Sequence, residues 1–90
     1  MATIEITWSA FAEYGKEIAS ASFDFAIEAD DLAVCERVFH DTNTYGGELW
    51  DALQPVIPAR RSHTALSVGD KVSIDGRTYR CEMMGFALVA

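Results

Sequence analysis

Two cysteines and two histidines are the side chains of this 90-residue sequence that are best suited to hold a transition-metal ion. Cys35, His40, His63 and Cys81 together would supply a Cys2His2 donor set. Structural zinc sites bring their ligands in closely spaced pairs, but here four residues separate Cys35 from His40 and seventeen separate His63 from Cys81. Because neither interval is a usual ligand spacing, we expect no metal and no cofactor.

The same side chains do not form a nucleophile and its base. If Cys35 and His40 share one helix, an interval of five residues turns them by about 140° around the axis, toward different faces. His40 is instead expected to cap the C-terminal end of that helix, where an imidazolium complements the dipole. The sequence also lacks the G-x-S-x-G motif of serine hydrolases and the glycine-rich phosphate loops. We therefore predict no catalytic residues and a protein that is not an enzyme.

The composition predicts one small domain over residues 1–90. Half of the residues are apolar and 11% are aromatic, which suffices for one hydrophobic core and is atypical of a disordered chain. No apolar run approaches the roughly 18–20 residues of a membrane span. Residues 1–5 lack the basic segment of a secretion signal, so we expect a cytoplasmic protein in which Cys35 and Cys81 stay as buried thiols.

The net charge of −7 is unevenly distributed along the chain. Residues 1–54 hold eleven acidic and two basic side chains, a sum of −9, whereas residues 55–90 hold three acidic and five basic ones, a sum of +2. An acidic protein is poorly suited to bind nucleic acid directly, but its field can steer a basic partner. The residues expected to form an acidic surface are Asp24, Glu28, Asp30, Asp31 and Glu36. The alternative is that this charge only keeps the protein soluble.

Alternation of apolar and polar residues predicts a first β-hairpin over about residues 3–28. Apolar residues recur at every second position in residues 4–8 and again in residues 23–27, and Tyr14-Gly15 offers a turn between them. The predicted register pairs Ile4 with Phe25, Ile6 with Phe23, Trp8 with Ala21 and Glu13 with Lys16, and it also places Glu5 opposite Asp24. The competing interpretation is a helix that presents Phe11, Tyr14 and Ile18 on one side and is capped by Ser9.

Two helices are predicted in the middle of the chain. Asp30-Asp31 should begin the first, over about residues 31–41, with Leu32, Cys35 and Phe39 on its buried side and an end near residues 42–43. A shorter helix over about residues 48–54 should bring Leu49, Trp50 and Leu53 to one side before Pro55 stops it. Residues 55–62 contain two prolines and two arginines and are expected to form an exposed loop.

The last third of the sequence predicts a second β-hairpin, over about residues 71–89. Asp75-Gly76 is a strong two-residue turn signal that would place Val72 opposite Tyr79, and Gly85 marks a bend or bulge before a final strand. The predicted fold is therefore α+β, a mainly antiparallel sheet made of two hairpins, with the main helix and the short helix on one face.

One segment of the sequence resembles a known family. Ser67-Val68-Gly69-Asp70 followed by Val72, then Asp75-Gly76, Tyr79-x-Cys81 and Gly85-Phe86, is similar to the motif of YodL-like modules and of small uncharacterised proteins of actinobacterial phages and mobile elements. Upstream, residues 38–43 and 47–51 are similar to the middle of the same proteins, so the resemblance covers about residues 32–87. It implies a phage or mobile-element context and no defined chemistry. From the residues alone, the motif is explained by turns, with Ser67 bonded to backbone groups of the turn at Gly69-Asp70.

Three functions remain open at this stage. The first is a phage or mobile-element protein that binds and modulates a host protein without enzymatic activity, through the acidic half of the chain or through a patch of aromatic and basic residues. The residues predicted to form this partner-binding patch are Tyr45, Trp50, Asp51, Arg60, Arg61 and His63. Trp50 could equally belong to the core. The second function is a mimic of nucleic-acid phosphates that inhibits a host defence nuclease, and the third is a module that self-associates through sheet edges, as in a homodimer.

Overall fold

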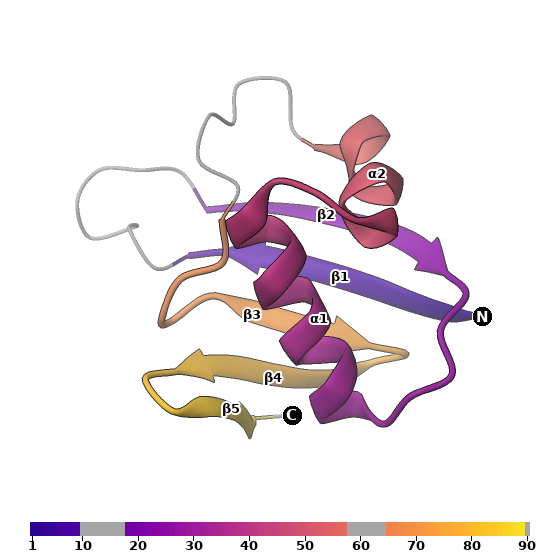
Figure 1. Ribbon diagram of the computed structural model, residues 1–90. Coiled ribbons are helices and arrows are strands. Elements are labelled where there is room, and N and C mark those ends of the chain that lie inside the picture. The colour runs from indigo at the N-terminus through magenta and orange to yellow at the C-terminus, as the bar shows by residue number, and fades with distance from the viewer. Residues whose placement is uncertain (10–17, 58–64, 90) are drawn as a thin grey trace.

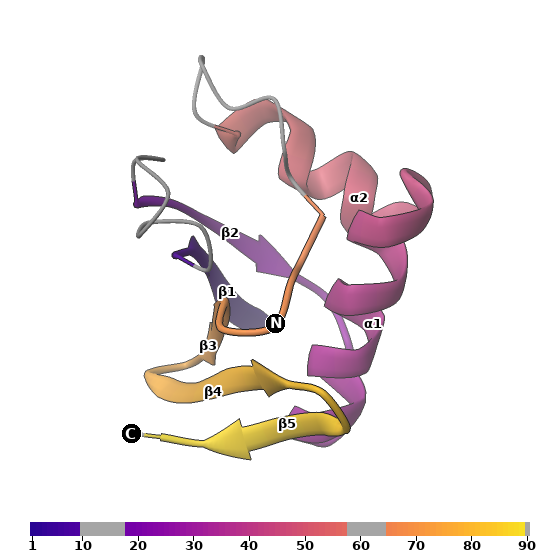
Figure 2. The same ribbon diagram turned by 90° about the vertical axis from the view of Figure 1, so that its left-hand side faces the viewer.

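The computed structural model describes residues 1–9, 18–57 and 65–89, which form an antiparallel sheet covered on one face by helices (Figures 1 and 2). The elements are β1 (Ala2–Trp8), β2 (Ala19–Phe25), α1 (Asp31–Thr44), α2 (Glu48–Leu53), the 3-10 turn η2 (Gln54–Val56), β3 (Lys71–Ile74), β4 (Arg77–Glu82) and β5 (Gly85–Leu88). The five strands are ordered β2-β1-β3-β4-β5. The predicted α+β fold is thus confirmed.

The core lies between the sheet and the two helices. Ile4, Ile6 and Trp8 of β1 alternate with exposed or half-exposed neighbours, so one face of the strand is fully buried. Val72 and Ile74 do the same on β3, which lies beside β1. From the helical layer, the core receives apolar side chains of both helices: Val34, Cys35, Val38, Leu49 and Leu53. Truncation of a buried Leu or Ile of this core to alanine would lower the free energy of unfolding by about 2–5 kcal/mol.

The buried side of α1 differs from the prediction. Cys35 is buried as expected, but Leu32 and Phe39 are 53% and 39% exposed. The helix instead buries Val34, Val38 and Thr42, which follow one another at intervals of four residues. Both stripes recur with helical spacing, and the periodicity alone could not decide which of them faces the sheet. The branched side chains Val34 and Val38 belong to the core, and the larger Leu32 and Phe39 remain partly exposed to solvent.

The register of β1 and β2 is shifted by two residues from the predicted one. Ile4 pairs with Phe23, Ile6 with Ala21 and Trp8 with Ala19. A shift of two keeps every side chain on its predicted face, since faces alternate with period two. It also moves Asp24 away from Glu5 to a position opposite Thr3, whose Oγ1 donates to Asp24 Oδ1 at 2.8 Å. The predicted turn, the Glu13–Lys16 pair and most of the competing helix lie outside the described residues.

The ends of the helices follow from local hydrogen bonds. Asp30 caps α1 as predicted, accepting from the Ala33 backbone N–H at 2.8 Å. The helix continues to Thr44, so His40 lies one turn before its end and not at the cap. The second helix ends at Leu53, before Pro55, as predicted. The chain then continues into the 3-10 segment η2, whose first turn accepts a proline because the missing N–H is not needed there.

The second hairpin has the predicted geometry. Asp75 and Gly76 both adopt positive φ angles, 48° and 88°, as a type I′ turn requires, and Val72 pairs with Tyr79. Asp75 joins this turn to β1 through its backbone and its side chain, because Asp75 N donates to Thr3 O at 3.0 Å and Thr3 N donates to the carboxylate oxygen Asp75 Oδ1 at 2.9 Å.

The segment at residues 67–70 combines a tight turn with a β-bulge. Asp70 N donates to Ser67 O at 2.9 Å, and Gly69 has a φ of 100°, as at the third position of a type II turn. Gly69 and Asp70 both face Cys81, which accepts from Gly69 N and donates to Asp70 O. Ser67 is thus bonded to a backbone group of the turn, as predicted, and the Asp70 carboxylate also accepts from Ser67 N at 2.9 Å.

An ion pair fastens the start of α1 to β4. Arg77 donates from Nε and Nη2 to the Asp31 carboxylate at 2.6 and 2.9 Å, and Tyr79 Oη donates to it at 2.7 Å. These hydrogen bonds, first that of Arg77 and then that of Tyr79, lower the pKa of Asp31 from 3.8 to about 2. The ionised carboxylate therefore stabilises the fold above about pH 4, and this contribution is lost as the pH falls through about 2.

We expect Asp31→Asn to lower the free energy of unfolding at pH 7 by about 1 kcal/mol, a small value because water screens a partly exposed pair. The loss of stability between about pH 4 and pH 2 should become shallower in this variant. Urea unfolding at a series of pH values measures both effects. The exposed Asp51→Asn variant is the control, and an acid-unfolding profile of Asp31→Asn equal to that of the wild type would contradict the assignment.

Candidate functional site

The loop between the helices presents an aromatic side chain in an unusual backbone conformation. Tyr45 follows the last residue of α1 with φ 55° and ψ 43°, a left-handed conformation in which glycine is the usual residue. Its side chain is 63% exposed and packs edge-on against Trp50 of α2, with ring centroids 5.5 Å apart and planes at 76°. We call the surface made by Tyr45, Glu48, Trp50 and Asp51 the α1–α2 corner.

A buried carboxylate supports this corner from below. The Asp41 side chain is 3% exposed and accepts from Arg37 Nε at 2.9 Å, while His40 Nδ1 lies 3.0 Å from its other oxygen. Burial by itself would raise the pKa of Asp41, but the hydrogen bonds of His40 and Arg37 outweigh it and the pKa is lowered. The backbone oxygen of Asp41 also accepts from the N–H of Tyr45. Asp41 thus stabilises both the last turn of α1 and the left-handed conformation of Tyr45 that follows it.

Gly47 lets α2 begin directly above that carboxylate. Its φ is 106°, and a Cβ atom at this position would lie 2.4 Å from Asp41 Oδ2. Gly47 O in turn accepts from Asp51 N at 3.0 Å, which is the first hydrogen bond of α2. The side chain of Asp41 and the missing side chain of Gly47 therefore fix the angle between the helices, and with it the approach of Tyr45 to Trp50.

The structure brings together part of the predicted partner-binding patch. Tyr45 and Trp50 are in contact, and Asp51 is exposed on the next residue of α2. Trp50 is half-buried and packs against the core, so it serves the core and the surface at once. Arg60, Arg61 and His63 lie outside the described residues. Sequence reasoning missed Asp41 as the support of this corner, although its four-residue spacing from Arg37 was a signal for an ion pair.

The five predicted acidic residues do not form one surface. Asp24 is exposed between Phe23 and Phe25 on β2, so it points away from the core and the helices. Glu36 is exposed on α1, in the layer that covers the other face of the sheet (Figure 2). Asp31 is neutralised by Arg77, and Asp30 accepts the capping hydrogen bond of α1. The remaining member, Glu28, is exposed between β2 and α1.

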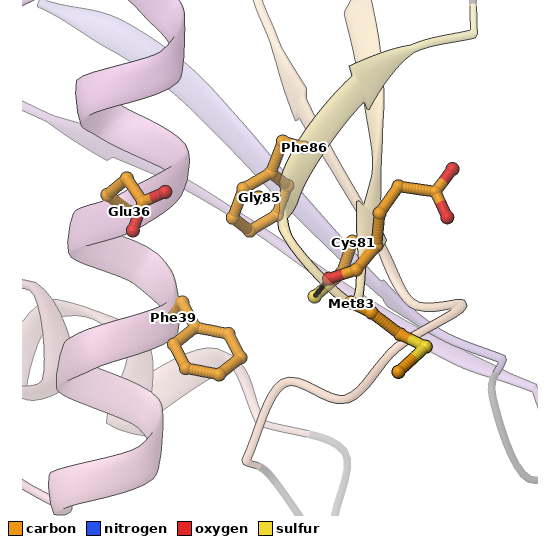
Figure 3. A pocket seen from close by; sticks show the side chains of 7 residues that line it. Glu36, Phe39, Cys81, Met83, Gly85 and Phe86 are labelled. Atoms are coloured by element: carbon orange, nitrogen blue, oxygen red, sulfur yellow. Dashed lines mark hydrogen bonds between the residues drawn. The ribbon is translucent and has the colours of Figure 1, made fainter.

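A second surface feature is a shallow hollow of about 140 Å³ between α1 and the β4–β5 turn (Figure 3). Glu36 and Phe39 of α1 lie on one side, and Cys81 and Phe86 lie on the sheet side. Burial raises the pKa of the Cys81 thiol, so that it stays protonated and a poor nucleophile. The lining of the hollow is therefore suited to an apolar contact and not to covalent chemistry.

Both cysteines are free and buried, as predicted. Burial raises the pKa of Cys35 to about 12 and also raises that of Cys81. We expect both thiols of the folded protein to react with a disulfide reagent at pH 8 at least about a hundredfold more slowly than in urea, because the thiolate is scarce and shielded. Absorbance of the released thiol measures this, and a fast phase in the folded protein would contradict it.

Within residues 1–9, 18–57 and 65–89, no three His, Cys, Asp or Glu side chains gather as a metal site would require. In that same part of the chain, no helix is both long and apolar enough to cross a membrane. Comparison with known proteins found no matching family model, no curated protein and no solved structure that is similar to this chain.

Proposed function

We propose that this chain is a phage or mobile-element protein that binds a host protein and modulates it without enzymatic activity, with the α1–α2 corner as its contact surface. The observation that carries the proposal is Tyr45, an exposed aromatic residue in a left-handed conformation, packed edge-on against Trp50. A non-glycine residue in this conformation costs about 1 kcal/mol or more, and such strain concentrates at functional positions. Tyr and Trp also dominate the energetics of protein interfaces.

The charge around the corner indicates the kind of partner. Glu48 and Asp51 are exposed beside the two aromatic rings, and the whole chain carries a net charge of −7. A partner with a basic surface and an apolar recess for Tyr45 would be steered by the charge and held by the ring. The phage or mobile-element context is supported by the resemblance of residues 32–87 to YodL-like proteins. The phosphate-mimic alternative needs one continuous acidic face, and the opposite placement of Asp24 and Glu36 does not support it.

The test is affinity capture from an actinobacterial host lysate with the tagged chain, followed by a titration with the captured protein at low and high salt. Tyr45→Asn removes the ring but keeps a residue that tolerates the left-handed conformation. We expect binding to weaken by more than about tenfold in this variant, and to weaken with salt in the wild type. Val68→Asn, an exposed apolar residue of the 67–70 turn, is the control. Absence of a saturable partner at both salt concentrations, or equal binding by the wild type and Tyr45→Asn, would overturn the proposal.

A further inference from the structure

We propose that a second copy of this chain pairs with the free edge of β5, so that two sheets join into one continuous antiparallel sheet. This inference is independent of the α1–α2 corner. Strands β2 and β5 are the two outer strands of the sheet and lie at its opposite ends (Figure 1). We call Gly85–Leu88 with its flanking residues Met83, Met84 and Val89 the β5 edge.

The hydrogen bonds of β5 show which of its backbone groups face outward. Val89 N donates to Thr78 O at 2.9 Å, so these two residues form a hydrogen-bonded pair of the β4–β5 ladder. Such pairs alternate with pairs whose N–H and C=O groups point away from the neighbouring strand. Phe86 and Leu88 occupy the second kind of position, opposite Cys81 and Tyr79. Their backbone groups therefore point to the free edge and are available to another strand.

The β5 edge lacks the charged side chains and the prolines that often protect an outer strand. Natural edge strands carry charged side chains, prolines or bulges that prevent pairing with another chain. Residues 85–88 include no charged residue and no proline, whereas the other outer strand carries Asp24. Met83 and Met84 next to the strand are 88% and 97% exposed, and Leu88 is 63% exposed. An apolar edge of this kind is a template for strand addition.

The side chains of the edge offer a continuous apolar contact on the helical face. Phe86 pairs with the buried Cys81, so Phe86 and Leu88 point to the same face as the core. Phe39 of α1 lies across the hollow from Phe86 (Figure 3). An added strand next to β5 would place alternate side chains over Phe86 and toward this hollow, which removes exposed apolar surface from water.

The charges near the edge favour a second copy over a basic partner. The nearest ions are largely paired with one another, Arg77 with Asp31 and Arg80 with Glu82 at 2.8 Å. Among the described residues, most exposed carboxylates without such an ion pair lie away from β5: Glu5, Asp24, Glu28, Asp30, Glu48, Asp51 and Asp75. Glu36 is the exception, because it borders the hollow beside Phe86. Because residues 83–89 carry no charge, two β5 edges can meet with little repulsion across the seam despite the net charge of −7 per chain.

The outward-pointing backbone groups of Phe86 and Leu88 also determine the register in which the two β5 strands can pair. A symmetric antiparallel pair must place outward-facing residues opposite one another, which a twofold axis through Ala87 achieves by setting Phe86 opposite Leu88 of the second copy. This register uses every outward group of the strand. Ala87 then lies directly opposite its own counterpart in a pair without hydrogen bonds, where the two Cα atoms are about 4.5 Å apart.

Sedimentation equilibrium of the full chain over a range of concentrations tests the association. We expect a concentration-dependent dimer, and a dissociation constant at least about tenfold larger for Leu88→Lys, which places two like charges in the seam. Ile18→Lys is the matched control, because Ile18 is 65% exposed beside the other outer strand and the charge change is the same. Tyr45→Asn should leave the dimer unchanged. A monomer at all concentrations, or a dimer weakened by Ile18→Lys and not by Leu88→Lys, would overturn the proposal.

Disulfide formation tests the register without relying on affinity. Ala87→Cys is expected to form an intermolecular disulfide under mild oxidation, because its Cβ atoms would lie within bonding reach across the axis. Ser22→Cys, exposed on the far outer strand, should remain a monomeric thiol, and Cys35 and Cys81 are buried in both variants. Cross-linking of both variants to the same extent would contradict the proposed pairing. Circular dichroism at equal concentration confirms that each variant is folded.

Discussion

Asp70→Ala is expected to lower the free energy of unfolding by about 3 kcal/mol, as the removal of a buried, fully bonded carboxylate does. Asp70 is 1% exposed, and its two carboxylate oxygens accept from Ser9 N at 2.8 Å and from Ser67 N at 2.9 Å. These bonds tie the end of β1 to the turn that begins β3. Without the carboxylate, two partly buried N–H groups lose their acceptors.

Urea unfolding followed by tryptophan fluorescence measures this loss, since Trp8 is buried in the adjacent strand end. Asp70→Asn should have an intermediate effect, because one oxygen remains to accept while the amide group opposes the second donor. Asp51→Ala, at an exposed position on α2, is the control and should change stability by less than about 0.5 kcal/mol. An effect of Asp70→Ala no larger than that of the control would show that the turn is held by other contacts.

Gly47→Ala is expected to destabilise the protein by about 2–4 kcal/mol. A methyl group there would lie 2.4 Å from Asp41 Oδ2, and the φ of 106° is strained for any residue with a Cβ atom. The Asp41 carboxylate cannot move away freely, because Arg37 and His40 hold it from two sides. The variant must therefore tilt α2 or break these hydrogen bonds.

Gly46→Ala is the matched control for this substitution. At Gly46 an added Cβ would meet only Thr44 O, at 4.0 Å, so we expect a change below about 1 kcal/mol. Thermal unfolding of the two variants compares them directly. If Gly47→Ala also weakens capture of the partner while Gly46→Ala does not, the angle between the helices matters for binding. Equal stabilities of the two variants would rule out the close contact with Asp41.

The elements that the sequence predicts well are those controlled by local chemistry. The Asp75-Gly76 turn and the Asp30 cap are consequences of a few neighbouring residues, and both have the predicted geometry. The register of β1 and β2 was predicted wrongly by two residues, because alternation alone identifies a face but not a partner. The observed register avoids the opposition of Glu5 and Asp24, a conflict already visible in the predicted pairing.

The candidate site could be predicted only in part. The aromatic residues Tyr45 and Trp50 suggested a contact surface, and the structure shows that their rings are in contact. The support from Asp41 could not be deduced, because it depends on a carboxylate reaching beneath a glycine six residues later. The buried side of α1 was also ambiguous, since two apolar stripes share the helix and only the position of the sheet chooses between them.

The strand order has a consequence for how the chain folds. β1 lies between β2 and β3, and its pairing with β3 joins Ile4 to Ile74, which are 74 − 4 = 70 residues apart in the sequence. The loop-closure entropy of such a contact must be overcome before the central strand has both neighbours. The β1–β2 and β3–β4 hairpins can form early, but each exposes an apolar face until they meet. Docking of the two hairpins along β1 and β3 is therefore expected to limit the folding rate.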